Sequence, residues 1–199
     1  MWGLVESGSV TQIYTRPKAI TVGEVNYPAN IFMLWSASEL EAIGIYSVVI
    51  DNTNLKDGKY YDNTNQSFNF ASGTVTASYG TATAKPLDDI LFTAQDETDG
   101  LGTEGEVKQK GIRQGHIDEI NAQAGGILQP TDWMVVRAAE GGTAVPSSIT
   151  TKRAAVRTKA NAMCTQITNA ANVDALAALY VYNTETPPVR PLGELPTVG

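Results

Sequence analysis

The spacing of hydrophobic positions changes near the middle of the chain. Before about residue 86, short apolar or β-branched runs such as residues 10–14 alternate with turn-forming residues, which is typical of β-strands. After about residue 126, apolar residues recur every three or four positions, which is typical of helices with one buried face. The pattern predicts an α+β protein with a β-rich first half and a helical second half.

Two hairpins are predicted in the first half, where strand-like runs flank a turn that contains glycine. They cover residues 19–27, with Gly23 at the turn, and residues 67–79, with Gly73 at the turn. Residues 45–50 form the most apolar run of this half. We therefore expect them to be its best-buried strand.

One short helix is predicted to interrupt the strands and to end at Gly44, which suits a left-handed C-terminal cap. Its start has the spacing of a capping box, in which a serine precedes a glutamate by three residues. Ser36 with Glu39 and Ser38 with Glu41 both have this spacing. Either serine is therefore a candidate N-terminal cap.

The second half is predicted to contain four helices. Thr131 is expected to cap the second of them, and the third carries an apolar stripe from Ile149 to Ile167. Lys152, Arg153, Arg157 and Lys159 are expected to lie mostly off that stripe. The four predicted helices are residues 104–124, residues 131–140, one that begins near Ser147 and one that begins near Asn172.

Charge and proline content divide the chain further. Residues 88–106 contain seven acidic residues and no Lys or Arg, so this stretch accounts for the whole formal charge of −7. Four prolines follow residue 184 and predict an extended tail, either free or laid along a partner. The predicted organisation is a β-rich domain (1–86), an acidic linker and helix (87–125), a small helical domain (126–183) and an extended proline-rich tail (184–199).

Composition excludes several kinds of chemistry. The single cysteine and single histidine exclude a disulfide framework and the usual zinc motifs, and the net negative charge argues against binding nucleic acid. No apolar run has the roughly 18 residues that a membrane span needs. Cys164 is expected within a helix, so with His116 it makes a poor catalytic pair. The sequence predicts no catalytic residue, no metal and no cofactor.

Three residue groups allow a binding interpretation beside a plainer one. The acids that begin at Asp96 miss the ligand positions of an EF-hand loop, which favours a solvated linker over an ion site. The basic cluster of Lys152, Arg153, Arg157 and Lys159 is either a solvated helix face or a docking patch for the acidic segment, in this chain or in a neighbouring copy. The tryptophans could stack on sugars if exposed, although Trp133 is more simply a core or interface anchor.

Two stretches of the first half resemble proteins of tailed bacteriophages. Residues 34–46 read LWSASELEAIGIY and resemble a W-S-x-x-E-L-x-A-I-G-I-Y segment found in small tail-region proteins. Residues 63–68 and 77–86 are similar to the part that follows this segment in such proteins from marine phages.

The second half carries a further resemblance. Residues 128–133 and 153–157 are similar to an L-x-x-T-D-W … R-x-x-x-R pattern in the C-terminal parts of phage tail-fibre and tail-fibre-assembly proteins. Residues 190–196 resemble the terminal motif of the same proteins. The resemblance spans most of the chain and carries no catalytic residue with it.

The resemblance implies a non-enzymatic structural component of a phage virion, in the tail, tail-fibre or baseplate region. Its partners would be other tail or fibre proteins and further copies of itself, after assembly in the host cytoplasm, and fibre attachment, host adhesion or contact with a host-surface glycan would be compatible with that place. The alternative is a tail-fibre assembly chaperone that leaves the mature particle. The predicted protein interface consists of Trp133, Arg153, Val156, Arg157, Met163 and Ile167.

Overall fold

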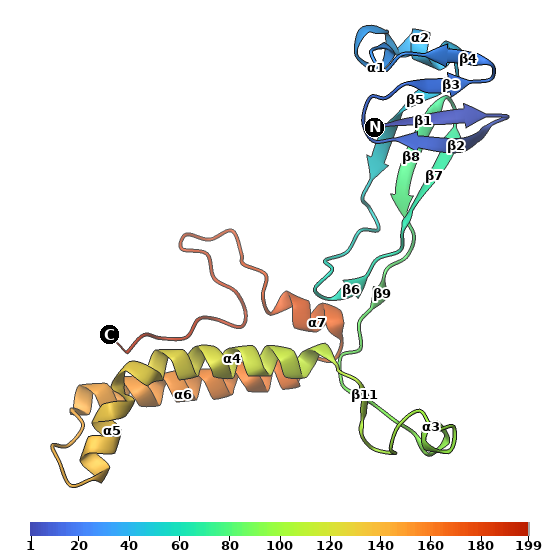
Figure 1. Ribbon diagram of the computed structural model, residues 1–199. Coiled ribbons are helices and arrows are strands. Elements are labelled where there is room, and N and C mark those ends of the chain that lie inside the picture. The colour runs from blue at the N-terminus through green and yellow to red at the C-terminus, as the bar shows by residue number, and fades with distance from the viewer. Residues whose placement is uncertain (199) are drawn as a thin grey trace. The chain divides into compact units, whose positions relative to one another are not determined.

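The protein is described by a computed structural model of residues 1–198, in which two compact units follow one another, Met1–Thr83 and Ala84–Gly199 (Figure 1). The first unit contains most of the strands, and the second contains most of the helices. The chain is therefore a mixed α+β protein. The boundary falls three residues before the predicted end of the β-rich domain.

A five-stranded sheet forms the first unit, in the spatial order β2-β1-β5-β8-β7. Neighbouring strands are antiparallel except β5 and β8, which run parallel. The outer strands β2 and β7 are in contact, so the sheet curls into a half-barrel. The strands are β1 (Trp2–Glu6), β2 (Ser9–Tyr14), β5 (Ile45–Asp51), β7 (Gln66–Ala71) and β8 (Thr74–Tyr79).

One face of this sheet is covered by a hairpin and two short helices. Leu4, Tyr14 and Ile45 of the sheet pack there against Phe32 and Leu40 of the cover. The predicted hairpin around Gly23 is confirmed, and so is the one around Gly73, whereas the first of the two helices was not predicted. The covering elements are β3 (Ile20–Val22), β4 (Val25–Tyr27), α1 (Ile31–Leu34) and α2 (Ala37–Ala42).

The concave face of the sheet holds a second small core. Val75 and Ala77 of β8 are fully buried, and a side chain at Gly3 would meet the methyl groups of Val75. The expectation for residues 45–50 is wrong, because only Ile45 is fully buried and Val49 and Ile50 are more than half exposed. The strand leaves the covered part of the sheet after its first residues.

Helix α2 begins and ends as its sequence predicts. The Ser36 hydroxyl accepts a hydrogen bond from the Glu39 backbone N–H, and the Glu39 carboxylate accepts from the Ser36 N–H, which selects the first of the two possible capping boxes. Gly44 has φ +82°, and a Cβ there would lie 2.8 Å from the Val5 carbonyl oxygen. Glycine is therefore required where α2 turns into β5.

Two antiparallel helices, α4 (Ile112–Leu128) and α6 (Ser147–Thr168), form the centre of the second unit (Figure 1). Along α6 the buried residues are spaced alternately by three and four, as in a coiled-coil seam. They are Arg153, Val156, Ala160, Met163 and Ile167. Because α4 packs along α6, residues 87–125 and 126–183 belong to one unit and are not the separate parts that the sequence predicted.

The remaining helices and short strands are as follows. Gln129–Thr131 (η1) leads into α5 (Asp132–Ala139). Helix α7 (Val173–Ala178) begins where predicted, is capped by the Asn172 side chain and buries Leu176. The helix predicted for residues 104–124 begins only at Ile112. The short paired strands are β10 (Ile90–Leu91) with β11 (Val107–Gln109), and β6 (Tyr61–Asp62) with β9 (Thr83–Ala84).

Residues 88–109, here called the acidic excursion, are folded. Strands β10 and β11 pair at its base, and α3 (Ala94–Thr98) carries a capping box formed by Thr93 and Asp96. The base is anchored on α4, because the Asp88 carboxylate pairs with Arg113 and the Asp89 carboxylate accepts from the Gly111 N–H. The predicted linker is therefore a structured projection from the start of α4.

The proline-rich tail folds back on the helices of its own unit. Leu192 is fully buried and Val198 nearly so. The Leu192 N–H donates to the Leu179 carbonyl oxygen at 3.0 Å, and the Lys159 ammonium donates to the Leu192 carbonyl oxygen at 2.8 Å. The tail contains no helix or strand up to residue 198, and its last residue lies outside the described residues.

Candidate functional site

Cys164 lies within α6, on the side that faces α4. Its Sγ lies 3.8 Å from Asn121 Oδ1, and burial raises the pKa of the thiol. A nucleophilic cysteine needs the opposite shift, since the thiolate is the reactive form. His116 is buried on α4, with its ring 4.7 Å from that of Tyr180. Neither residue therefore has the surroundings that would activate a thiol.

We expect the Cys164 thiol to react more slowly with iodoacetamide at neutral pH in the folded protein than in the urea-unfolded chain. Its raised pKa lowers the thiolate fraction, and its partial burial restricts access. The alkylation rate, followed by intact mass spectrometry, measures this. A folded protein that reacts faster than the unfolded chain would contradict the assignment of Cys164 as a structural residue.

The Asp96 carboxylate stabilises the fold of the acidic excursion through hydrogen bonds. Asp96 accepts hydrogen bonds from the Lys108 ammonium and from Thr93, and these bonds lower the pKa of Asp96 to about 2.

Within residues 1–198, no three or more His, Cys, Asp or Glu side chains are arranged to hold a metal ion. Among the same residues, no helix combines the length and the apolar character that a bilayer crossing needs.

The cap of α3 should survive mild acid. Asp96 has a folded pKa below its ordinary value of 3.8, so its contribution to stability is complete above that value and is lost as the pH falls through about 2. We expect its carboxyl carbon resonance to titrate near pH 2. Lys108→Gln should raise this midpoint, whereas Lys110→Gln, which removes a charge two residues away, should not. An Asp96 midpoint unchanged by Lys108→Gln would show that the pair does not form in solution.

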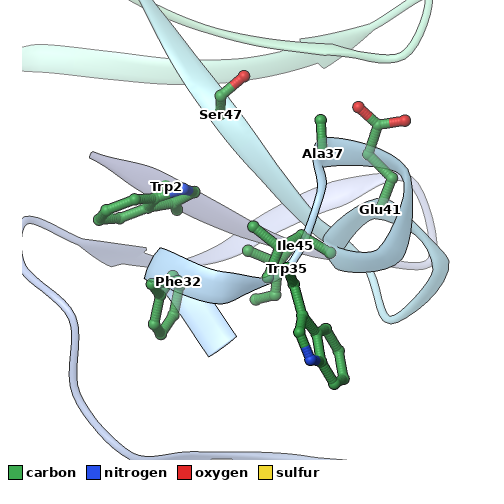
Figure 2. Close-up of a pocket in the computed structure, with 8 residues that line it drawn as sticks. Trp2, Phe32, Trp35, Ala37, Glu41, Ile45 and Ser47 are labelled. Atoms are coloured by element: carbon green, nitrogen blue, oxygen red, sulfur yellow. The ribbon is translucent and has the colours of Figure 1, made fainter. Parts of the chain in front are cut away.

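An aromatic pocket of about 190 Å³ lies in the first unit, beneath α1 and α2 (Figure 2). The Trp2 ring packs on Phe32 at 4.8 Å between ring centres, and the Trp35 ring packs on Tyr27 at 5.7 Å. Figure 2 shows the two indoles pointing in different directions, with Glu41 turned away from both. Trp2 and Trp35 therefore contribute to the core of this unit and form no common stacking platform for a sugar.

A buried arginine organises the far end of the helical pair. Arg153 is 5% exposed and lies on the buried stripe of α6, which corrects the expectation that the basic cluster lies off it. Its guanidinium donates to the Leu128 carbonyl oxygen at 2.8 Å, to the Thr131 hydroxyl, and to the Asp132 carboxylate at 2.6 Å. We call these four residues the arginine lock. It holds the end of α4 and the start of α5 against α6.

The arginine lock also changes the role of Thr131. We expected its side chain to cap α5, but the hydroxyl donates to the Leu128 carbonyl oxygen at 2.9 Å and accepts from Arg153. Thr131, at the start of α5, is therefore hydrogen-bonded both to the end of α4 and to α6. Sequence reasoning missed this because an Arg–Thr contact across 22 residues has no local signal.

Helix α5 presents an apolar surface next to the lock. Trp133 is 55% exposed and Val136 is 56% exposed. The Arg137 guanidinium stacks on the Trp133 ring, 4.8 Å from its centre. Exposed tryptophan and arginine are the residues most enriched at the centres of protein interfaces. This end of the helical unit is therefore a candidate interaction surface.

The six residues of the predicted interface divide into two groups. Val156, Met163 and Ile167 are fully buried between the helices of this unit, and Arg153 is held in the arginine lock. In this fold they cannot contact a partner directly. Trp133 and Arg157 are exposed, so the interface remains a prediction for these two residues.

Within one chain, the basic cluster does not bind the acidic segment, because two of its lysines bind the tail instead. The Lys152 ammonium donates to the Val198 carbonyl oxygen, and the Lys159 ammonium donates to the tail at Leu192. The cations that pair with the acidic excursion are instead Lys108 and Arg113. Arg157 is the exposed member of the cluster that neither holds the tail nor takes part in the lock.

Comparison with protein-family models, with curated proteins and with solved structures found no match to this chain.

Proposed function

We propose that this protein is a non-enzymatic structural component of a tailed bacteriophage virion, in its tail, tail-fibre or baseplate region. It acts by binding other tail or fibre proteins, and copies of itself, through the helical unit. The proposal combines the resemblance of two sequence patterns with the structural roles that their residues have in this fold.

One observation carries the proposal. In the L-x-x-T-D-W … R-x-x-x-R pattern, Leu128, Thr131, Asp132 and Arg153 form the arginine lock. The two remaining residues of the pattern, Trp133 and Arg157, are left on the surface. A pattern with buried residues that position a helix and exposed residues suited to an interface is what a protein-binding element requires.

The first-half pattern supports the same kind of role. Its Ser36, Glu39 and Gly44 shape a helix and a turn, and Leu40 and Ile45 enter the core. These residues of the first-half pattern have structural roles here, which supports a scaffold role.

Mass spectrometry of purified particles of the phage that encodes the chain tests this proposal. We expect near-stoichiometric copies, in a small multiple of the tail symmetry. Trp133→Ala should lower incorporation, because it removes the exposed anchor, while Val181→Ala, which truncates another exposed apolar side chain of the same unit, should not. Both variants should unfold at the wild-type temperature.

Two results would contradict the proposal. Absence from particles, with the chain bound to fibre protein in infected lysate, would establish the assembly chaperone instead. Wild-type incorporation and infectivity of Trp133→Ala would show that the α5 surface is not the interface.

A further inference from the structure

We propose that copies of this chain bind one another head to tail, with the acidic excursion of one copy seated in a groove at the α5 end of the next. This contact rests on the proposed function, in which the chain also binds copies of itself, and it specifies the two surfaces that meet. It uses a groove on the helical unit that is distinct from the exposed Trp133 ring.

The groove is a small aliphatic hollow with a basic rim. It has a volume of about 240 Å³ and lies between α5, the loop before α6, and α6. The Arg157 side chain lies at its exposed edge, and Arg153 of the lock lies below. Its walls are formed by Val135, Val145 and Thr150. Such a hollow suits one aliphatic side chain that is accompanied by carboxylates.

The acidic excursion presents that combination. Leu101 is 61% exposed at its tip, although its backbone N–H is fixed by the Asp96 carbonyl oxygen at 2.9 Å. Asp99 and Glu104 flank it in sequence, and both are exposed. An exposed leucine on an ordered turn loses little conformational freedom on binding, which favours its use as an anchor.

The acidic excursion and the segment that forms the groove carry net charges of opposite sign, as a contact between them requires. Residues 88–109 contain seven acidic residues and one basic residue. Residues 130–158 contain two acidic and four basic residues. Opposite potentials on two patches steer association and fix its orientation, although each exposed ion pair contributes only about 0–1 kcal/mol.

Geometry makes this contact intermolecular. Arg113 ties the acidic excursion to the first turn of α4, and Arg153 ties the groove to Leu128 at the last turn. The rise of 1.5 Å per residue places these two positions roughly 22 Å apart along the helix. Figure 1 shows α3 and α5 beyond opposite ends of α4. The acidic excursion of one chain therefore cannot reach the groove of the same chain, whereas it can reach the groove of a second chain. Repetition of this head-to-tail contact forms a ring or a filament.

Sedimentation velocity of the purified full chain tests the proposal. We expect concentration-dependent association at about 0.1 M salt that weakens at about 1 M, since the Debye length falls from about 10 Å to about 3 Å. Leu101→Asp and Arg157→Glu should each raise the dissociation constant by about tenfold or more. Val181→Asp and Arg16→Glu make the same chemical changes at other exposed positions and should have little effect.

Mixing the two interface variants provides the decisive measurement. Leu101→Asp keeps an intact groove, and Arg157→Glu keeps an intact acidic excursion, so each should be monomeric alone and a mixture should form a 1:1 dimer. This dimer also shows that both variants are folded. A monomeric wild type at about 0.1 M salt, association unaffected by either variant, or no mixed dimer would overturn the proposal. None of these outcomes bears on whether the chain is present in particles.

Discussion

Replacing Arg153 by methionine is expected to lower the free energy of unfolding of the helical unit by about 2–4 kcal/mol. The variant keeps the aliphatic stem but removes the donors to Leu128, Thr131 and Asp132. The buried Thr131 hydroxyl keeps its bond to Leu128 but loses the charged donor, and a hydrogen bond to a charged group contributes about 1.5–3 kcal/mol. Urea unfolding followed by far-ultraviolet circular dichroism measures the loss, because nearly all helix lies in this unit.

Arg157→Met is the matched control for this prediction. It makes the same substitution four residues later on the same helix, at an exposed position, so we expect a change within about 0.5 kcal/mol. Equal effects of the two variants would mean that the arginine lock contributes nothing to stability. A large loss for Arg153→Met with an unchanged Trp133 environment would mean that the lock does not position α5.

The second large effect is expected from the tail. Leu192→Ala should destabilise the helical unit by about 2–5 kcal/mol, the usual range for emptying a fully buried leucine position. It should also speed cleavage of residues 184–198 by proteases, since Leu192 anchors the tail on α6 and α7. Urea unfolding and limited proteolysis measure the two consequences.

Val189→Ala is the control within the same tail. Val189 is 51% exposed, so we expect its truncation to change stability by no more than about 0.5 kcal/mol. If Leu192→Ala also has no effect on stability or cleavage, the tail is not packed on its own unit in solution. The extended tail that the proline content predicts, either free or laid along a partner, would then be the better description.

Local sequence patterns determined much of the secondary structure. Glycine turns specified both hairpins, and the Ser36–Glu39 spacing specified α2. The stripe from Ile149 to Ile167 predicted the buried face of α6. These features depend on residues a few positions apart, where backbone preferences and one-sided burial are written directly into the chain.

The candidate interaction surface depended on tertiary structure. Arg153 belongs to the basic cluster by sequence, yet partners 21 to 25 residues away make it a buried lock. Arg157, in the same cluster and one turn further along α6, remains exposed at the groove beside α5. Packing between helices therefore decides that Arg153 is structural and that Arg157 is available to a partner.

The acidic segment and the proline-rich tail show the same division. Composition determined the charge of the acidic segment and the absence of helix in the tail, and it predicted a solvated linker and an extended tail. Only the fold placed Asp88 against Arg113, Asp96 against Lys108 and Leu192 into a buried position. Composition determines how much charge and how much apolar surface a segment carries. The contacts that order such a segment come from residues distant in sequence, so its order is a property of the tertiary structure.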